Sequence, residues 1–351
     1  NTDAVFAGYT HMQPSEPITF AHYCSAILNA MQRDYRRIAH CYEALNICPL
    51  GGGSMGSTTW DIDRNYTAKL LGFDAPVDNS IDCVASRDFT TDILAVLSLS
   101  ANTLSRFCQD LYVWATPDYG YVEVSDSCAV CSSIMPQKKN PWVLEHIKAK
   151  AAHVEGAFMS ALNVLKNVIY SHSEDTCGEA AKYLFTGIDE MKEMCELMEV
   201  SIKGITVKKD RMLETARGNF CTVTELANYL VRHDKISFRM AHDIVADVVA
   251  YMIEHNKKAD EIGTDVVNPI FMRLFGRTTS MTDEEVRAAL DPTKIAYAKK
   301  CIGGTAPEEV TRQLKNRQAV LDSDNAELAA RESAVAEAKA ELEAEVAKMI
   351  A

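Results

Sequence analysis

The sequence predicts an all-α protein built around a long helical bundle. Three observations support this: apolar residues recur at helical spacing over stretches of about 25 to 30 residues, strand-like alternation is nearly absent, and loops rich in glycine or proline separate the stretches. A helix of that length spans about 40 Å, more than one small globular domain can cover. The long helices therefore need partners alongside them, as in a bundle.

Four long helices are expected in the first part of the chain. The first covers 16–45, with Pro17 near its start, and Pro49 with the glycines after it ends the segment. An apolar stripe from Phe89 to Leu111 predicts the second helix. The second, third and fourth helices are predicted over 86–115, 142–168 and 178–202.

The helices predicted after about Lys208 are shorter, which indicates a second, smaller helical domain. Their ranges are 222–232, 238–255 and 283–290. From Ala306 onward the chain is rich in Ala, Glu, Leu and Lys, which favours helix. Its apolar residues are too widely spaced to predict a coiled coil; an exposed helical tail is favoured over an interaction module, and both stay open. The expected domains are a central one over 1–207, a C-terminal one over 208–312 and the tail over 313–351.

Composition and charge narrow the class of protein. The 351 residues are 47% hydrophobic, enough for a sizeable core in a soluble globular protein. Lys and Arg number 36 against 49 Asp and Glu, a net charge of −13 with no basic block, so we expect no nucleic-acid partner. No apolar run of about 18 residues predicts a membrane segment. The start, NTDAVFAGYT, resembles no signal peptide and lacks an initiator Met, so we expect a fragment of a longer protein.

The eleven cysteines are scattered, and they favour reduced thiols in the cytoplasm over a disulfide framework. Cys128 and Cys131 form a CxxC pair, but no second pair stands at zinc-ligand spacing. A packing role is favoured for this pair, and a redox or metal-binding role stays open. The sequence contains neither a ligand cluster nor a glycine fingerprint after a strand, so we expect no metal and no nucleotide cofactor.

The strongest candidate for a functional site is the loop before the third predicted helix. It reads Ser132-Ser133-Ile134-Met135-Pro136-Gln137-Lys138-Lys139-Asn140-Pro141. Two hydroxyls stand a few residues before two lysines and an amide, and two prolines restrict the backbone. Such a loop can present a hydroxyl, a cation and an amide to one small anion. The alternative is a helix-entry loop with Asn140 as N-cap and Pro141 at the first helical position, and local physics leaves the two interpretations evenly balanced.

Two further loops contain polar residues that could take part in a site. One is residues 8–14, which includes Thr10 and His11, and the other is residues 79–89, which includes Arg87. Taken singly, a structural role is favoured for each: a His near a helix start is more often structural than catalytic, Asn79 or Ser86 can cap the following helix, and Arg87 can be a surface charge.

Together, these segments resemble one family. In chain order they are GYTHMQPSEP, CPLGGGSMGSTTWDIDR, NSIDCVASRDF and SSIMPQKKNP. This order resembles argininosuccinate lyases of the fumarase/aspartase superfamily, whose signature is SSxMPxKxNP. Gly303-Gly304-Thr305-Ala306-Pro307 is similar to the C-terminal domain of these lyases. The resemblance covers about residues 1–315. It implies the superfamily's long central helical bundle, and an N-terminal portion with a Ser-Arg-Asn substrate loop that this sequence does not contain.

The resemblance also implies a reaction, the β-elimination of fumarate from an N-substituted aspartate, with argininosuccinate giving arginine and fumarate as the default. Ser132 then corresponds to the base that removes the Cβ proton, and Lys138 supplies positive charge that favours the ionised hydroxyl. Lys138 and Asn140 donate to the dianionic intermediate, where one preorganised donor contributes roughly 3–4 kcal/mol. Thr10 and His11 match an anion-binding and proton-handling pair.

The remaining site residues also follow from the resemblance. Glu145 matches the carboxylate that orients the His, which suits an acid that protonates the departing amine. Ser133 and Met135 belong to the substrate-binding loop, and Arg87 is expected to shape the third loop. The family forms cytoplasmic homotetramers in which each active site takes its three loops from three chains, so a lone monomer is expected to be inactive.

The sequence departs from the family pattern in two places. Cys131 stands where the signature usually has Gly before the two serines, which changes backbone freedom in the loop. After the third helix, these lyases typically carry a segment like YNKDLQEDK, whose Tyr, Gln and second Lys contact the substrate. By spacing from Glu145, those positions hold His172, Cys177 and Ala180. An Ala cannot hold a carboxylate as Lys does, which puts arginine as the leaving group in doubt.

Three interpretations therefore stay open from the sequence. The first is an argininosuccinate-lyase-like C–N lyase of arginine biosynthesis, and the second is a paralogous lyase with a different amine leaving group. His172 is the candidate that faces this amine. The third is a non-enzymatic relative, because the family includes lens crystallins that keep the fold as structural proteins. Retention of Ser132, Lys138, His11 and Glu145 argues against the third.

Overall fold

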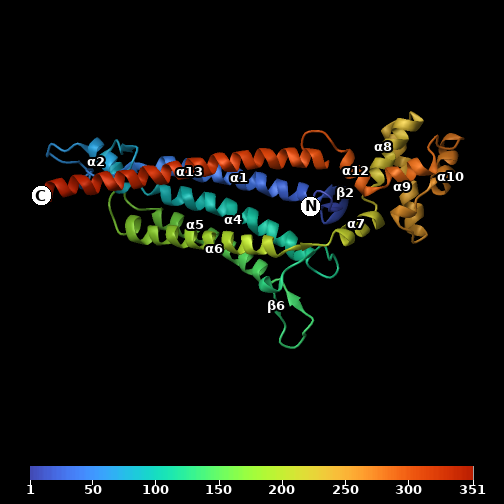
Figure 1. Cartoon of the computed structure of the whole chain (residues 1–351), viewed down its shortest axis with the longest axis horizontal. Coiled ribbons are helices and arrows are strands. Elements are labelled where there is room, and N and C mark those ends of the chain that lie inside the picture. Colours follow the sequence, from blue (N-terminus) through green and yellow to red (C-terminus); the bar gives the residue numbers. More distant parts are fainter. Residues whose placement is uncertain (351) are drawn as a thin grey trace. The chain divides into compact units, whose positions relative to one another are not determined.

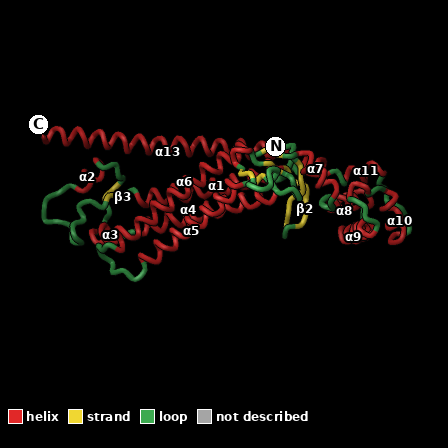
Figure 2. Tube along the Cα trace, turned by 90° about the horizontal axis from the view of Figure 1, so that it is seen from below, coloured by secondary structure: helices red, strands yellow, loops and turns green. Residues whose placement is uncertain are grey.

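The computed structural model describes residues 1–350 and confirms the all-α class (Figures 1 and 2). Within these residues, the strands are short two-stranded pairs beside much longer helices. The α-helices are α1 (Phe20–Leu45), α2 (Arg64–Leu70), α3 (Ser80–Ala85), α4 (Asp88–Trp114), α5 (Trp142–Leu165), α6 (Ala180–Gly204), α7 (Lys209–Gly218), α8 (Val223–Asp234), α9 (Phe238–Glu254), α10 (Thr264–Phe275), α11 (Asp283–Ala289), α12 (Pro292–Ala298) and α13 (Pro307–Ile350). The strands are β1 (Val5–Thr10), β2 (Gln13–Thr19), β3 (Ile47–Cys48), β4 (Ala75–Pro76), β5 (Val122–Glu123), β6 (Val130–Cys131), β7 (Lys139–Asn140) and β8 (Thr206–Val207).

The chain divides into two compact units. Unit 1 comprises Asn1–Ala26, Trp114–Glu123 and Ile205–Asn316, and unit 2 comprises Ile27–Val113, Val124–Gly204 and the chain from Arg317 onward. The domain boundaries that the sequence predicts, at 207 and 312, stay a prediction. No helix among the described residues is long and apolar enough to cross a membrane.

Unit 1 begins with a β-hairpin, and the end of its second strand takes the place of the first residues of the helix predicted over 16–45. β1 and β2 pair antiparallel, so the helix expected from Glu16 begins only at Phe20. Pro14 and Pro17 stand in β2, opposite Tyr9 and Ala7. A two-stranded ribbon tolerates proline because each strand is an edge, with N–H groups that need no partner strand. Proline near position 16 therefore marks a strand rather than the first helical turn.

Aromatic side chains hold the hairpin against the rest of unit 1. Phe6 is buried and contacts Trp114 and Tyr121 edge-on, with ring centroids 5.4 and 5.9 Å apart. Such pairs contribute about 0.5–1.5 kcal/mol beyond their buried area. The predicted small helical domain has a core of its own, in which α8, α9, α10 and α11 bury a continuous set of apolar residues, among them Leu230, Ile244 and Phe271.

In unit 2 the long helices α4, α5 and α6 pack side by side (Figure 1). Leu94 of α4 lies against Ala157 of α5 and against Gly187 of α6, where an added Cβ would stand 2.3 Å from the Leu94 side chain. Glycine at 187 therefore permits the close approach of α6. Leu94 is fully buried, so Leu94→Ala would destabilise the unit by about 2–5 kcal/mol.

The predicted long helices agree with the structure to within a few residues after the first, because their apolar stripes are long. The sequence did not predict the shorter helices, namely α2, α3, α7, α10 and α12. It also did not predict the two-residue strands β5, β6 and β7. Two-residue strands carry too little pattern to predict. The tail predicted from residue 313 lies within α13, which begins six residues earlier and runs without a break from Pro307 to Ile350.

Candidate active site

Thr10 and His11 lie at the tip of the β1–β2 hairpin in unit 1. Thr10 pairs with Gln13, which leaves His11 and Met12 as the two turn residues. Both have positive φ, 53° and 59°, as the two-residue turn that matches strand twist requires. Asn and Gly are the usual residues there, and a His or Met is strained. This hairpin tip projects the exposed imidazole of His11 away from the core.

The two serines lie on a second hairpin, in unit 2. β6 pairs antiparallel with β7, Cys131 opposite Lys139, and residues 132–138 form the connecting loop. We call residues 130–140 the serine hairpin. The Ser132 N–H donates to the Lys138 carbonyl (3.3 Å) and the Lys138 N–H donates to the Met135 carbonyl (2.9 Å). These bonds hold a strongly exposed loop in one shape without an apolar core beneath it.

The Ser132 hydroxyl faces two backbone donors of its own loop. Its Oγ accepts from the N–H groups of Ile134 (3.4 Å) and Met135 (3.2 Å). Amide donors aimed at an oxygen favour its ionised form. Ser132 is half-buried, whereas Ser133 is exposed. The geometry therefore distinguishes the two adjacent serines and singles out Ser132.

The two lysines of the serine hairpin stand in different structural positions. Lys139 belongs to β7 and forms an ion pair with Asp126 at 2.7 Å, which lowers the pKa of that carboxyl. Lys138 is the last residue of the connecting loop, and Asn140, next to Lys139 in β7, faces the opposite side of the strand. Asn140 belongs to β7, and the residue that precedes α5 as its N-cap is Pro141. The alternative in which Asn140 caps the helix is therefore wrong: strand pairing holds it instead.

Glu145 stands in the first turn of α5, where it accepts a hydrogen bond from the Tyr112 hydroxyl at 3.0 Å. This bond and the charge of Glu145 raise the pKa of Tyr112. Lys148, one turn along, lies 4.0 Å from the centre of the Tyr112 ring. No local pattern predicts a role for Tyr112, because only the antiparallel packing of α4 on α5 brings it to Glu145. The predicted pairing of Glu145 with His11 stays a prediction.

Arg87 and His172 meet at one sulfur atom. The Arg87 guanidinium donates to Cys177 Sγ (3.4 Å) and to the Ser86 carbonyl, and His172 Nδ1 lies 3.3 Å from the same sulfur. Asn79 caps α3 by accepting from the N–H groups of Ile81 and Asp82, as the structural alternative for this loop predicted. Cys177, which the sequence placed at a diverged position, thus joins the loop before α4 to the segment before α6.

The predicted residues of unit 2 fall into two groups. Tyr112 with Glu145, and Gln109 with Lys148 (3.0 Å), show that α4 and α5 run antiparallel. Arg87 and His172 therefore lie at one end of these helices, and the serine hairpin lies at the other. α5 contains 24 residues, so about 36 Å of helix separates the two groups. One copy of unit 2 does not bring Arg87 to Ser132.

A cavity adjoins Arg87 at its end of the bundle. It has a volume of about 590 Å³, and its polar lining includes Arg87, Asn163, Lys166 and Tyr170. The lining combines two cations, Arg87 and Lys166, with one carboxylate, Asp88, which leaves one net positive charge. No set of three or more His, Cys, Asp or Glu side chains within residues 1–350 is arranged to hold a metal ion. All eleven cysteines are free, with Cys128 buried and Cys131 exposed on β6.

Comparison with known proteins places the chain first in a class and then in a family. Residues 1–156 match the family described as lyase, and residues 220–296 match the family described as argininosuccinate lyase C-terminal. With the all-α fold, the first match defines a helical lyase of the fumarase/aspartase superfamily. The chain belongs to the argininosuccinate lyase family within it, since it is 36% identical over 316 residues to an argininosuccinate lyase of Acetivibrio thermocellus, covering 90% of this chain and 67% of that protein.

Two further relatives are similar over most of the chain. Argininosuccinate lyase 1 of Shouchella clausii is 49% identical over 325 residues, which are 93% of this chain and 65% of that protein. The crystal structure of EDDS lyase in complex with formate matches with a TM-score of 0.90 at 32% identity, covering 99% of this chain and 69% of that one. The chain thus spans about two thirds of the length of these relatives.

Proposed function

We propose that this chain forms the helical core of a cytoplasmic carbon–nitrogen lyase that eliminates fumarate from an N-substituted aspartate. The observation that carries the proposal is the serine hairpin of a member of the argininosuccinate lyase family, in which Ser132 Oγ accepts from two amide donors and the same hairpin contains Lys138 and Asn140. Argininosuccinate, giving arginine and fumarate, is the default substrate. Thr10, Ser133 and Met135 belong to the substrate-binding surface of this proposal.

Ser132 acts as the base. Its Oγ takes the Cβ proton of the succinyl group, and the electron pair left behind passes into the neighbouring carboxylate. A serine hydroxyl is a poor base in water, so the ionised form must be stabilised in place. The N–H groups of Ile134 and Met135 supply fixed donors at Oγ, and Lys138 supplies positive charge nearby.

The intermediate carries two negative charges on one carboxyl group, and the barrier falls only if donors already point at them. Lys138 and Asn140 are the donors in this proposal, and each contributes roughly 3–4 kcal/mol when preorganised. Lys139 has a different role, because its ammonium group is paired with the Asp126 carboxylate. In the sequence Lys138-Lys139-Asn140, the first and third residues are thus the proposed donors, and the second has a structural role.

Elimination is complete when the Cα–N bond breaks and the amine leaves. The electron pair returns from the carboxyl group to form the Cα=Cβ bond, and the nitrogen takes a proton from an acid. His11 is the acid and Glu145 orients its ring. Tyr112 holds one Glu145 oxygen and leaves the second for the imidazole, which keeps the carboxylate in one rotamer.

The active protein is a homotetramer whose sites combine loops of different chains. The separation of Arg87 from Ser132 along α5 supports this: within one unit 2, about 36 Å of helix divides them. Large exposed apolar side chains, including Leu99 on α4, Met159 on α5 and Phe185 on α6, give the bundle faces to bury in such an assembly.

A lyase with a different amine as leaving group is the second candidate, and one observation favours it. Cys177 contacts both His172 and Arg87, and Ala180 is fully buried. Position 180 therefore offers no cation to the amine side. The group recognised there must suit an imidazole, a thiol and a guanidinium.

The proposal is tested by offering the full-length protein a panel of N-substituted aspartates, argininosuccinate among them, and following the ultraviolet absorbance of fumarate. We expect fumarate from at least one of them, and no fumarate from any member would contradict the proposal. Shared sites are tested by co-expressing Ser132→Ala with His11→Ala subunits. Mixed tetramers should regain activity that neither parent has, whereas inactive mixtures would contradict the shared arrangement.

A further inference from the structure

We propose that the C-terminal part of α13, residues 331–350, is a positioning element that braces α2 and, through it, the glycine-rich loop of residues 49–63. For this part of the chain, the sequence favours an exposed helical tail over an interaction module and assigns it no function. The argument about turnover rests on the proposed function, whereas the argument about the loop's stability does not. Every contact that carries the inference lies within unit 2.

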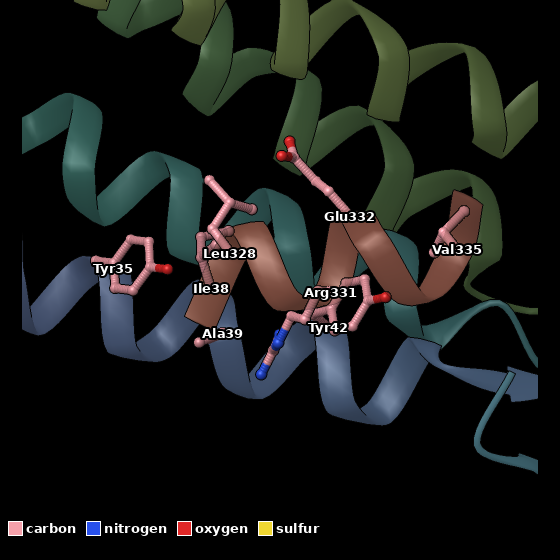
Figure 3. A pocket seen from close by; sticks show the side chains of 8 residues that line it. All are labelled: Tyr35, Ile38, Ala39, Tyr42, Leu328, Arg331, Glu332 and Val335. Atoms are coloured by element: carbon pink, nitrogen blue, oxygen red, sulfur yellow. The ribbon is translucent and has the colours of Figure 1, made fainter. Parts of the chain in front are cut away.

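From Asp324 onward, α13 is docked along α1. Arg36 of α1 forms an ion pair with the buried Asp324, and the Tyr35 hydroxyl donates to the Asp324 carbonyl at 3.1 Å. Further along, the Arg331 guanidinium lies 4.5 Å from the centre of the Tyr42 ring (Figure 3). An apolar groove of about 370 Å³ opens between the two helices at this level. α1 therefore fixes the direction of α13 as it approaches α2.

α13 then meets α2 through a close approach of backbones. Gly72 follows α2 with a φ of +78°, and a Cβ at this position would stand 3.2 Å from Ala338 Cβ. Larger side chains on either side would force the helices apart. One turn further, Lys69 of α2 pairs with Glu341 of α13 at 2.7 Å. A small-residue contact and an ion pair thus join α2 to the tail.

α2 passes this constraint to the glycine-rich loop. Arg64, in the first turn of α2, donates through Nε to the Leu50 carbonyl (3.1 Å) and through Nη2 to Cys83 Sγ (3.3 Å). The Arg64 side chain also lies against Gly51, where an added Cβ would be 3.0 Å away at a φ of +87°. The start of the loop is therefore clamped to one side chain of α2.

The loop in turn contacts the residues beside Arg87 and His172. The Met55 carbonyl accepts from Ser80 Oγ at 2.6 Å, and Met55 Sδ lies 3.5 Å from Ser171 Oγ. Ser80 begins α3, which ends just before Arg87, and Ser171 precedes His172. Met55 has a φ of 148°, a conformation that a residue with a side chain keeps only when its surroundings hold it.

Most of the glycine-rich loop is exposed; the buried exception at its start is Gly52, which packs against Cys83, and Ser57 Oγ donates to the Gly51 carbonyl at 3.1 Å. Between residues 49 and 63 the loop's own backbone hydrogen bonds join Gly52 to Pro49, Ser57 to Gly52 and Ile62 to Trp60. Trp60 is 81% exposed. Segments with few buried contacts open most easily, so the external clamp through α2 and α13 decides how often this loop leaves its place.

The test compares two equivalent substitutions on α13 in the full-length protein. Ala338→Leu puts a larger side chain against Gly72, and Ala340→Leu makes the same change at an exposed position of the same helix. Hydrogen exchange of the amides in residues 49–63 is followed by mass spectrometry. We expect exchange at least about fivefold faster in Ala338→Leu, because overpacking displaces the helix, and unchanged exchange in Ala340→Leu.

Turnover supplies the readout that a purely structural role would not move. Ala338→Leu should raise KM at least about threefold with kcat unchanged, because Arg87 and His172 contribute to binding rather than to proton transfer. Equal loop exchange in the two variants would overturn the brace. Absence of fumarate from the unmodified protein would overturn the proposed function instead and leave the exchange comparison valid.

A charge exchange keeps the proposal falsifiable if Ala338→Leu fails to fold. Lys69→Glu and Glu341→Lys should each speed loop exchange by about twofold to fivefold, and the double variant should restore the original rate. A double variant as fast as the single ones would overturn the role of this ion pair as part of the brace.

Discussion

The serine hairpin and the segment of residues 170–180, here called the amine segment, lie at opposite ends of α4 and α5 and differ in how they are held. Backbone bonds such as Ser132 N–H to the Lys138 carbonyl shape the hairpin and leave its side chains available. In the amine segment the candidate side chains bind each other, with Cys177 between Arg87 and His172. The side chains of the serine hairpin are therefore available for a ligand without rearrangement. Those of the amine segment either separate to bind a ligand or contact it together as one cluster.

On the proposed function, the serine hairpin carries the elimination reaction, and the amine segment carries the specificity for the leaving amine. A loop set by its backbone keeps its geometry whatever amine the substrate carries, because no substrate contact is needed to form it. A cluster set by side chains changes with each substitution, since one altered side chain releases its partners. On the proposed function, a lyase of this kind can therefore keep one elimination chemistry and vary the leaving group at the distant end of the helices.

The largest effect is expected at the hairpin. Ser132→Ala should lower kcat about a thousandfold, because the base that takes the Cβ proton is lost. Steady-state fumarate production measures this, with Ser133→Ala as the comparison: its exposed hydroxyl belongs to the proposed binding surface, so its loss should change KM rather than kcat. Equal losses in the two variants would mean that the amide donors at Ser132 Oγ do not distinguish the base.

A second comparison separates the two adjacent lysines. Lys138→Ala should lower kcat about a hundredfold, as for loss of one preorganised donor. Lys139→Ala should change it less than about threefold, because an ion pair between exposed partners such as Asp126 contributes little. The reverse order would show that β7 presents its other side to the substrate.

A smaller effect of a different kind is expected in the amine segment. Cys177→Ala removes the sulfur that holds Arg87 and His172, so KM should rise about threefold to tenfold while kcat stays the same. The size of the change should differ between amines in a substrate panel. A uniform fall in kcat would instead assign this cluster to the chemistry and break the comparison.

The sequence predicted the parts of the fold that have long patterns. The apolar stripes of α4, α5 and α6 extend over many turns, and glycine or proline marks their ends, so type and position followed from local physics. The β1–β2 hairpin did not, because proline at 14 and 17 suits a helix start as well as an edge strand. The pairing of β2 with β1 decides between a helix start and an edge strand at these prolines.

For the candidate site, sequence motifs predicted which residues belong to it, whereas their hydrogen-bond partners became known only from the packing of the helices. Ser132, Lys138 and Asn140 lie close together in sequence, so a single hairpin determines their relative positions. The bond from Tyr112 to Glu145, and that from Arg87 to Cys177, join residues 33 and 90 positions apart. No local pattern encodes such contacts, since they depend on which helices pack antiparallel.

Tyr112 therefore offers the smallest and most specific prediction. Tyr112→Phe should lower kcat about threefold, because Glu145 loses the hydroxyl that restricts its rotamer. The contact with Glu145 raises the pKa of Tyr112, so the hydroxyl keeps its proton below its ordinary pKa of about 10 and the bond is lost only as the pH rises through the higher value. The loss should accordingly be constant from about pH 6 to 9, with Tyr183→Phe at the other end of the bundle as control. A loss that grows between these values would mean that Tyr112 titrates during catalysis, and would move it from orienting Glu145 to handling the proton itself.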